Sequence, residues 1–403
     1  MTKERHNCLP VASSFVPARL RLPVLLAAQV PLLLGYIVGI APTVWPSSSD
    51  QTSSSIDAKP YMLQASSSLP VPRPIVRASS VSCADFQCAV LGYDAKEHLE
   101  LYTERLGGGS WTLSPVLTLP GSHAMSSIAC NAGASCLAVG QEAGQPSSVN
   151  LEGGRLYNLR VPPPSESTGG GLDGVSCVAS VWCLAVGFDF PTGSVAGPLA
   201  YVFYGRRWAI SSVAPRNSAV SLDAASCTTV RRAIRCAAVG YKLGGELSSF
   251  PPSSARPVPF ISSYGGGRWN TIALTPGYGR LFGVSCWPRD CVAVGRGDTS
   301  SGSSALVIQQ TVNGWRTSTP AMKGGLTAVS CWSPGNCAIG SSAGDMIVMQ
   351  DQRYHVVRTM SGSFTGVSCV ARGATGICMF VGSRRAANSA GLVPLVVSAL
   401  FRH

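Results

Sequence analysis

Residues 175–187, VSCVASVWCLAVG, place two cysteines six positions apart and end in Ala-Val-Gly. The same arrangement recurs along the chain, so that 14 of its 15 cysteines form close pairs and only Cys8 is left over. Successive pairs begin 38 to 59 residues apart. In repeats built from β-branched residues, glycine and aromatic residues, this period is typical of the four-stranded blades of a β-propeller. The seven pairs are Cys83 and Cys88, Cys130 and Cys136, Cys177 and Cys183, Cys227 and Cys236, Cys286 and Cys291, Cys331 and Cys337, and Cys369 and Cys378.

One repeat can be divided into four strands. In the third repeat we expect an inner strand at 174–177, a turn at 178–182 and a returning strand at 183–186. Cys177 and Cys183 then face each other closely enough to bond. By loop entropy each such bond contributes roughly 2 kcal/mol. The small Ala-Val-Gly segment is expected to let neighbouring blades pack closely. A third strand is expected at 199–203, and a fourth begins at Trp208.

The outer strands indicate how the ring closes. Seven repeats carry only six outer-strand aromatic residues, and the last repeat stops with the chain after LVPLVVSAL at 392–400. Residues 61–70, YMLQASSSLP, share the length and ending of WTLSPVLTLP at 111–120. The segment 59–70 is therefore predicted to supply the outer strand of the last blade. The six aromatic residues are Trp111, Tyr157, Trp208, Trp269, Trp315 and Tyr354.

The N-terminal region predicts a membrane anchor. Residues 22–45 are 24 positions without a charge, enough to cross a bilayer as a helix. Basic residues precede this segment and none follows it in 46–58, so the positive-inside rule places the propeller outside the cell membrane. The alternative is a cleaved signal peptide and a secreted protein. The expected domains are a cytoplasmic basic tail at 1–21, a transmembrane signal-anchor helix at 22–45, a Ser-rich tether at 46–58 and the propeller at 59–403.

The repeat unit supports a family resemblance. A Gly-Gly-x-Trp outer strand, Val-Ser-Cys, a short loop and Cys-x-Ala-Val-Gly follow one another. Over residues 60–403 this unit resembles exported bacterial seven-bladed propellers related to the Asp-box (BNR-repeat) and photosystem II assembly-factor-like families. The resemblance implies an all-β propeller of four-stranded blades with one disulfide per blade. The Asp-box itself is degraded, because SSYGGGRW at 262–269 has Tyr264 where the motif has Asp.

Two functions of different classes fit this fold, because the resembling families include sialidases, assembly factors and binding proteins. The favoured one is a non-catalytic binding or scaffold module for a protein or an envelope polysaccharide. The alternative is a glycoside hydrolase or lyase, similar to the sialidase propellers, with its site in the central channel. Such an enzyme needs at least two carboxylates and an arginine cluster at one channel mouth. Acidic residues are sparse and the histidines stand alone, so we expect no catalytic residues.

Charge and cysteine spacing argue against other ligands. The net charge is +12, but basic residues occur singly or in pairs without an aromatic-interleaved stripe, so no nucleic-acid partner is expected. Zinc is the rival explanation for the cysteines. A tetrahedral site needs four ligands, however, and each pair lies in a different blade. No metal and no cofactor are therefore expected.

Five residues are candidate ligand contacts. Trp182, Trp287 and Trp332 lie beside cysteines of the stapled turns, where they could stack on a sugar or pack over the disulfide. Arg384 and Arg385 form one of several arginine pairs that could receive an acidic polymer or lie on a solvated face. The loops between second and third strands vary most in length. This variation favours a recognition surface opposite the disulfide turns, although tolerated insertions explain it equally well.

Overall fold

The computed structural model describes residues 62–68, 75–85, 87–105, 111–113, 123–131, 135–153, 155–165, 167–179, 182–191, 196–213, 219–243, 256–272, 274, 277–288, 290–300, 302–322, 324–386 and 391–402. The expected tail, membrane span and tether, residues 1–58, lie outside this set. Within the described residues, no helix has the length and apolar character needed to cross a membrane.

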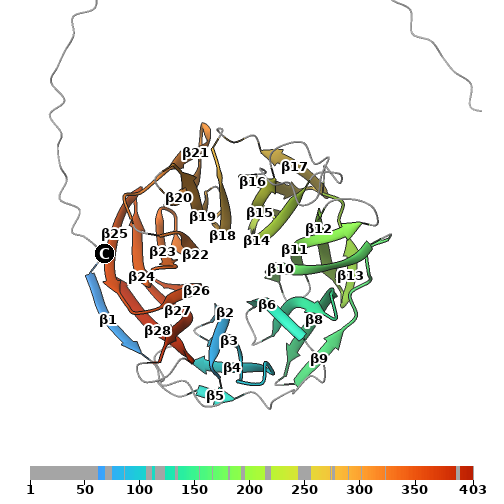
Figure 1. Ribbon diagram of the computed structural model, residues 1–403, viewed down its shortest axis with the longest axis horizontal. Coiled ribbons are helices and arrows are strands. Elements are labelled where there is room, and N and C mark those ends of the chain that lie inside the picture. Colours follow the sequence, from blue (N-terminus) through green and yellow to red (C-terminus); the bar gives the residue numbers. More distant parts are fainter. Residues whose placement is uncertain are drawn as a thin grey trace, which may run out of the picture. The chain divides into compact units, whose positions relative to one another are not determined.

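The strands form seven four-stranded antiparallel sheets arranged as the blades of a ring (Figure 1), as the sequence predicts. From the ring axis outward, the blades consist of β2 (Arg77–Ala84), β3 (Gln87–Tyr93), β4 (Leu99–Arg105) and β5 (Trp111–Leu113); β6 (His123–Cys130), β7 (Cys136–Glu142), β8 (Gln145–Glu152) and β9 (Arg155–Leu159); β10 (Ser167–Ala179), β11 (Trp182–Pro191), β12 (Gly197–Tyr204) and β13 (Arg207–Ile210); β14 (Val220–Val230), β15 (Ala233–Leu243), β16 (Pro257–Gly265) and β17 (Arg268–Ile272); β18 (Gly279–Cys286), β19 (Cys291–Thr299), β20 (Gly302–Thr311) and β21 (Gly314–Ser318); β22 (Leu326–Ser333), β23 (Asn336–Ser341), β24 (Asp345–Gln350) and β25 (Arg353–Thr359); and β26 (Ser363–Arg372), β27 (Thr375–Arg385), β28 (Leu392–Arg402) and β1 (Met62–Ser68).

The burial of each strand follows its place in the blade. In β11, Leu184, Ala185 and Val186 are all fully buried, because a second strand is covered by blades on both of its faces. In the outer strand β13, Trp208 is buried between exposed neighbours, because only one face meets another blade. This layering explains two sequence patterns. The second strand of a blade has an apolar run before its glycine, and the outer strand has a single aromatic residue.

The last blade is assembled from both ends of the described chain. β1 lies within the segment 59–70 and pairs antiparallel with β28, from Met62 opposite Arg402 to Ser68 opposite Val397. Figure 1 shows β1, in blue, beside the red strands of this blade. This pairing covers the edge of β28, which would otherwise present unpaired backbone groups.

The inner strands are longer than expected, and each contains a bulge. β10 begins at Ser167, seven residues before the predicted start, and Trp182 begins β11 instead of ending the turn. The pairing of β10 with β11 shifts between Leu172 and Gly174, which bends the strand. The same shift occurs in the other blades, at Ala78/Ser80, Met125/Ser127, Leu222/Ala224, Leu281/Gly283, Leu326/Ala328 and Phe364/Gly366.

In five blades the glycine of the Ala-Val-Gly tripeptide or its equivalent has a different role from the one expected, whereas Gly340 of blade six has the expected role, because an added Cβ there would meet Phe364 of blade seven. Gly187 lies beside the bend of β10, where an added Cβ would collide with the carbonyl oxygen of Gly171 in the same blade. The equivalent collision is with a carbonyl oxygen of the same blade's inner strand at Gly140, Gly240, Gly295 and Gly382. At these positions the glycine permits close approach of two strands within a blade, and packing between blades is not the cause.

In six of the seven blades a serine precedes the first cysteine and links its blade to the next. Cys177 and Cys183 lie opposite each other with Cα atoms 4.1 Å apart, the spacing of a pair that does not exchange backbone hydrogen bonds. The N–H of a first cysteine therefore points away from its own sheet. Six of these amides donate to a serine Oγ of the preceding blade, at 2.9 to 3.0 Å: Cys83 to Ser368, Cys130 to Ser82, Cys227 to Ser176, Cys286 to Ser226, Cys331 to Ser285 and Cys369 to Ser330. We call this set the serine ring.

The serine ring is interrupted at one position. The second blade has Ala129 where the others have serine, and no described side chain accepts a hydrogen bond from the N–H of Cys177. The bond from Cys83 to Ser368 crosses the junction between the first and last blades, so the ring also ties together segments from distant parts of the chain.

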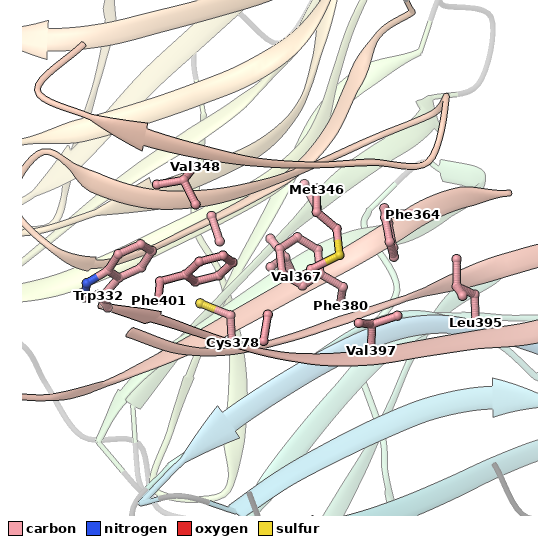
Figure 2. Packing of buried hydrophobic residues seen from close by; sticks show 13 residues of the cluster. Trp332, Met346, Val348, Phe364, Val367, Cys378, Phe380, Leu395, Val397 and Phe401 are labelled. Atoms are coloured by element: carbon pink, nitrogen blue, oxygen red, sulfur yellow. The ribbon is translucent and has the colours of Figure 1, made fainter. Parts of the chain in front are cut away.

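The hydrophobic core is divided among the interfaces between blades. Between blades six and seven, Trp332 stacks on Phe401 with ring centroids 5.6 Å apart, and Phe380 meets Phe401 edge-on (Figure 2). All three side chains are at most 1% exposed. Each fully buried aromatic side chain of this size contributes about 2–3 kcal/mol through the hydrophobic effect.

Candidate functional site

All seven predicted cysteine pairs are disulfides. Their Cα atoms are 3.9 to 4.1 Å apart, and each bond closes the hairpin between the first and second strands of its blade. The two sulfurs of each pair are bonded to each other, so these cysteines do not provide thiolates for a zinc site.

Of the predicted aromatic contacts, Trp332 is contradicted by the structure. Its side chain is 1% exposed and fills the interface against Phe401, so it cannot touch a ligand. Trp182 is half-buried and packs 6.1 Å from the ring of Tyr264 in the next blade. Trp287 is also half-buried, and its Nε1–H donates to the carbonyl oxygen of Cys331 at 3.1 Å. Trp182 and Trp287 therefore each contact a residue of the following blade, whereas the sequence suggested packing over the neighbouring disulfide.

The predicted arginine contacts lie on the face of the ring opposite the disulfide turns. Arg384 and Arg385 are exposed at the end of β27, and β27 starts at the disulfide hairpin. Its two ends therefore lie on opposite faces. The tryptophans adjoin the disulfide turns, so the structure does not bring the two groups of candidates together into one site.

A groove of about 750 Å³ lies between blades four and five on the disulfide-turn face. It contains three exposed arginines, Arg231, Arg235 and Arg268, and the described residues that line it include no Asp or Glu. Within the described chain, no ion pair engages these guanidinium groups. Uncompensated positive charge along a groove attracts anions. Blade five contributes Trp287, Gln310 and Trp315 to the opposite wall.

The strand register of blade four places Arg235 and Arg268 on the same face of the sheet. Thr228 pairs with Arg235, Arg235 with Gly265, and Gly265 with Arg268, so the four residues form one row across four strands. Residues in such a row share a face of the sheet. Neighbouring strands are about 4.8 Å apart, which places the two arginine Cα atoms about 10 Å apart on either side of a residue without a side chain. We call Thr228, Arg235, Gly265 and Arg268 the arginine row.

The residue after the first cysteine contributes to the size of the groove but does not set it alone. Trp332 directly follows the first cysteine of blade six and fills the interface with blade seven. In blade four the same position is Thr228, which lines the groove. The equivalent space between blades one and two, bordered by Ala84 and Cys130, measures only about 20 Å³ although alanine is smaller than threonine. The groove between blades four and five is therefore much larger than this equivalent space, and Thr228 is one of several residues that shape it.

The turn at the rim of the groove is strained. Arg231 and Arg232 join the paired residues Val230 and Ala233, with φ angles of 48° and 69°. Two-residue hairpin turns with positive φ at both positions favour Asn-Gly. For other L-residues this conformation costs about 1 kcal/mol or more each. Such strain concentrates at functional sites.

A second polar cluster joins blades three to five at their bulges. Arg280 donates to both carboxylate oxygens of Asp223, from Nε at 2.6 Å and Nη2 at 3.1 Å, and its guanidinium lies 4.4 Å from the ring centre of Tyr241. Asp173 occupies the equivalent bulge of blade three. Burial, together with the negative charge of Asp223, raises the pKa of Asp173 to about 7.

This cluster meets only part of what the hydrolase alternative requires. It contains two carboxyl groups, but the charge of Arg280 is used by Asp223 within the cluster. Two nitrogens of this guanidinium are already engaged by a carboxylate, which weakens its attraction for a substrate carboxylate. The geometry thus offers a part-buried ion pair with a neighbouring protonatable carboxyl group.

Comparisons with known proteins bear on the fold. No family model and no curated protein matches the chain. Among solved structures the chain is similar to one described as YCF48 bound to D1 peptide, with 14% identity and a TM-score of 0.52 over 85% of this chain and 98% of that chain. YCF48 from Cyanidioschyzon merolae gives 11% identity and a TM-score of 0.51 over 83% and 98% of the two chains. U3-55K gives 8% identity and a TM-score of 0.56 over 84% and 99%. At these identities the similarity shows the fold, and it supports the resemblance to the photosystem II assembly-factor-like propellers.

The groove was not predicted from the sequence. The expected recognition surface was the face with variable loops, whereas the groove lies among the disulfide turns. One sequence signal accompanies it, the Arg231-Arg232 pair inside a stapled hairpin. This signal does not show that Arg235 and Arg268 lie in one row, because they are 33 positions apart in the chain.

Proposed function

We propose that the propeller is a non-catalytic binding module whose partner is a protein, bound in the groove between blades four and five. The observation that carries this proposal is the groove itself, whose arginines form no ion pair with a carboxylate in the described part of the chain. A propeller similar in fold has been solved with a peptide bound, which supports a protein partner over a polysaccharide. Use of Arg280 within its own cluster weakens the hydrolase alternative.

We also propose that the binding module is held outside the cell membrane by the segment 22–45. The uncharged length of this segment and the basic residues before it support this orientation. Seven disulfides favour an oxidising compartment. Secretion after cleavage is the other route to the same compartment.

A site-specific crosslinking experiment tests the binding function. A photoreactive amino acid replaces Gln310, on the groove wall, in the full chain expressed in its native cells, with the same substitution at Arg384 on the opposite face as control. We expect one recurrent protein adduct from position 310 only. The purified partner should then bind the wild-type chain in calorimetry. Adducts that contain carbohydrate instead of protein, or equal yields from both positions, would contradict the proposal.

A groove-filling variant provides the second measurement. Thr228→Trp introduces the side chain that occupies this position in blade six. We expect the variant to lose binding of the purified partner while Arg384→Trp retains it. Circular dichroism and the melting temperature establish that each variant is folded. Full binding by folded Thr228→Trp would place the partner elsewhere.

A further inference from the structure

We infer that the groove between blades four and five selects an extended, acidic peptide segment, recognised by Arg231 and the arginine row. The inference rests on the proposed protein-binding function and specifies the chemistry of the partner. It is carried by charge complementarity: three exposed guanidinium groups line the groove, and none of the described residues that line it carries a carboxylate. Guanidinium groups bind carboxylates through paired, directional hydrogen bonds.

The arginine row fits the dimensions of an extended chain. Arg235 and Arg268 flank Gly265, so the centre of the row lacks a side chain and leaves room for a peptide backbone. Acidic side chains two positions apart in an extended peptide lie about 7 Å apart on one face. The flexible stems of two arginines whose Cα atoms are about 10 Å apart can reach both carboxylates.

The remaining lining favours a peptide over an acidic polysaccharide. Apolar residues, including Ile234, Ile272 and Trp315, line the same groove as the arginines. A peptide that alternates acidic and apolar side chains presents both chemistries to such a surface. Among the described residues, no side chain accepts a hydrogen bond from Trp315, whereas Trp208 and Trp269 donate to serines of the preceding blade. The indole of Trp315 is therefore available to an incoming group.

The hairpin turn of blade four places one more arginine at the rim. Arg231 and Arg232 occupy the two positive-φ positions of this turn, where Asn-Gly is the favoured pair. Asp351 and Gln352 form the same kind of turn outside the groove, so the strain by itself does not indicate a ligand. The contribution of the turn is positional, because of its two arginines only Arg231 lines the groove.

The direct test is fluorescence polarisation with the full chain and two labelled peptides. Gly-Glu-Leu-Glu-Val-Glu-Gly is the acidic probe, and its counterpart has Gln at each Glu. We expect the acidic peptide to bind at least tenfold more tightly than the Gln peptide, with affinity falling several-fold between 50 and 500 mM salt. A polygalacturonate oligomer serves as the acidic polysaccharide and should compete at least tenfold less effectively. Equal binding of the two peptides, or tighter binding of polygalacturonate, would overturn the inference.

Charge-matched variants locate the interaction. The triple variant R231Q/R235Q/R268Q should weaken binding of the acidic peptide at least thirtyfold. The control R372Q/R384Q/R385Q removes the same charge from exposed sites in blade seven and should stay within twofold of wild type. Equal losses in the two variants would show that net charge, and not the groove, attracts the peptide.

A variant of the turn separates binding from folding. R231N/R232G installs the favoured turn residues, so it should raise the melting temperature while weakening peptide binding several-fold. Unchanged affinity would remove Arg231 from the site. If crosslinking at Gln310 captures a protein but acidic peptides do not bind, the chemical inference fails while the proposed function stands.

Discussion

The serine ring offers a sharp test of how the blades are held together. Ser226→Ala removes the acceptor of the Cys286 N–H, a part-buried hydrogen bond of 2.9 Å. Ala129→Ser does the reverse, because it introduces an acceptor at the one blade whose partner amide, on Cys177, lacks a described side-chain acceptor. The two substitutions should therefore shift stability in opposite directions.

The magnitudes follow from hydrogen-bond energetics. An amide left without a partner costs about 1–3 kcal/mol when buried, so a part-buried one should cost about 1–2 kcal/mol. A new bond contributes about 0.5–1.5 kcal/mol. For the compact unit Asp57–His403, an unfolding entropy of about 2.1 cal/mol/K per residue gives about 0.7 kcal/mol/K. Ser226→Ala should lower the melting temperature by about 1.5–3 °C, and Ala129→Ser should raise it by about 1–2 °C.

Differential scanning calorimetry measures both shifts, and amide hydrogen exchange at positions 286 and 177 localises them. Ser263→Ala is the matched control, because its hydroxyl donates an exposed bond of 3.3 Å to the carbonyl oxygen of Asn270 and its loss should shift the melting temperature by less than about 0.5 °C. A lower melting temperature for Ala129→Ser, or unchanged exchange at Cys286 in Ser226→Ala, would refute the role assigned to the serine ring.

Three further perturbations test other parts of the fold. Replacing Cys177 and Cys183 together by serine opens a loop with a sequence separation of 6 and should cost about 2 kcal/mol in chemical denaturation; an unchanged midpoint would contradict the loop-entropy estimate. The pKa of Asp173 is raised from 3.8 to about 7, so the folded protein binds more protons than the unfolded chain between these values and stability falls as pH rises. Asp173→Asn should therefore stabilise the protein at pH 8, by at most about 4 kcal/mol, and lose most of this gain at pH 5; equal melting shifts at both pH values would show that the carboxyl group titrates normally. Deleting residues 62–68 uncovers β28 and should abolish cooperative thermal unfolding, whereas a melting curve like that of the full chain would contradict ring closure by β1.

Several features of the fold could be predicted because they are encoded locally and repeatedly. The cysteine spacing within each hairpin sets the disulfide partner, and seven repetitions set the number of blades. Positions of the bulges could not be predicted, because a bulge depends on how two strands pair and leaves no fixed residue type. Its unpaired position is Asp173 in blade three but Thr365 in blade seven.

The candidate site depended almost wholly on tertiary structure. The sequence by itself determined an all-β propeller with one stapled hairpin per blade, since each of those features follows from residues within one repeat. It also determined that positive charge is in excess and scattered. Only the folded ring decided which charges meet: pairing across β15, β16 and β17 brings Arg235 and Arg268 into one row, and Thr228 leaves the space beside them unfilled. The physical reason is that strand register and packing between blades place residues side by side that the sequence holds far apart.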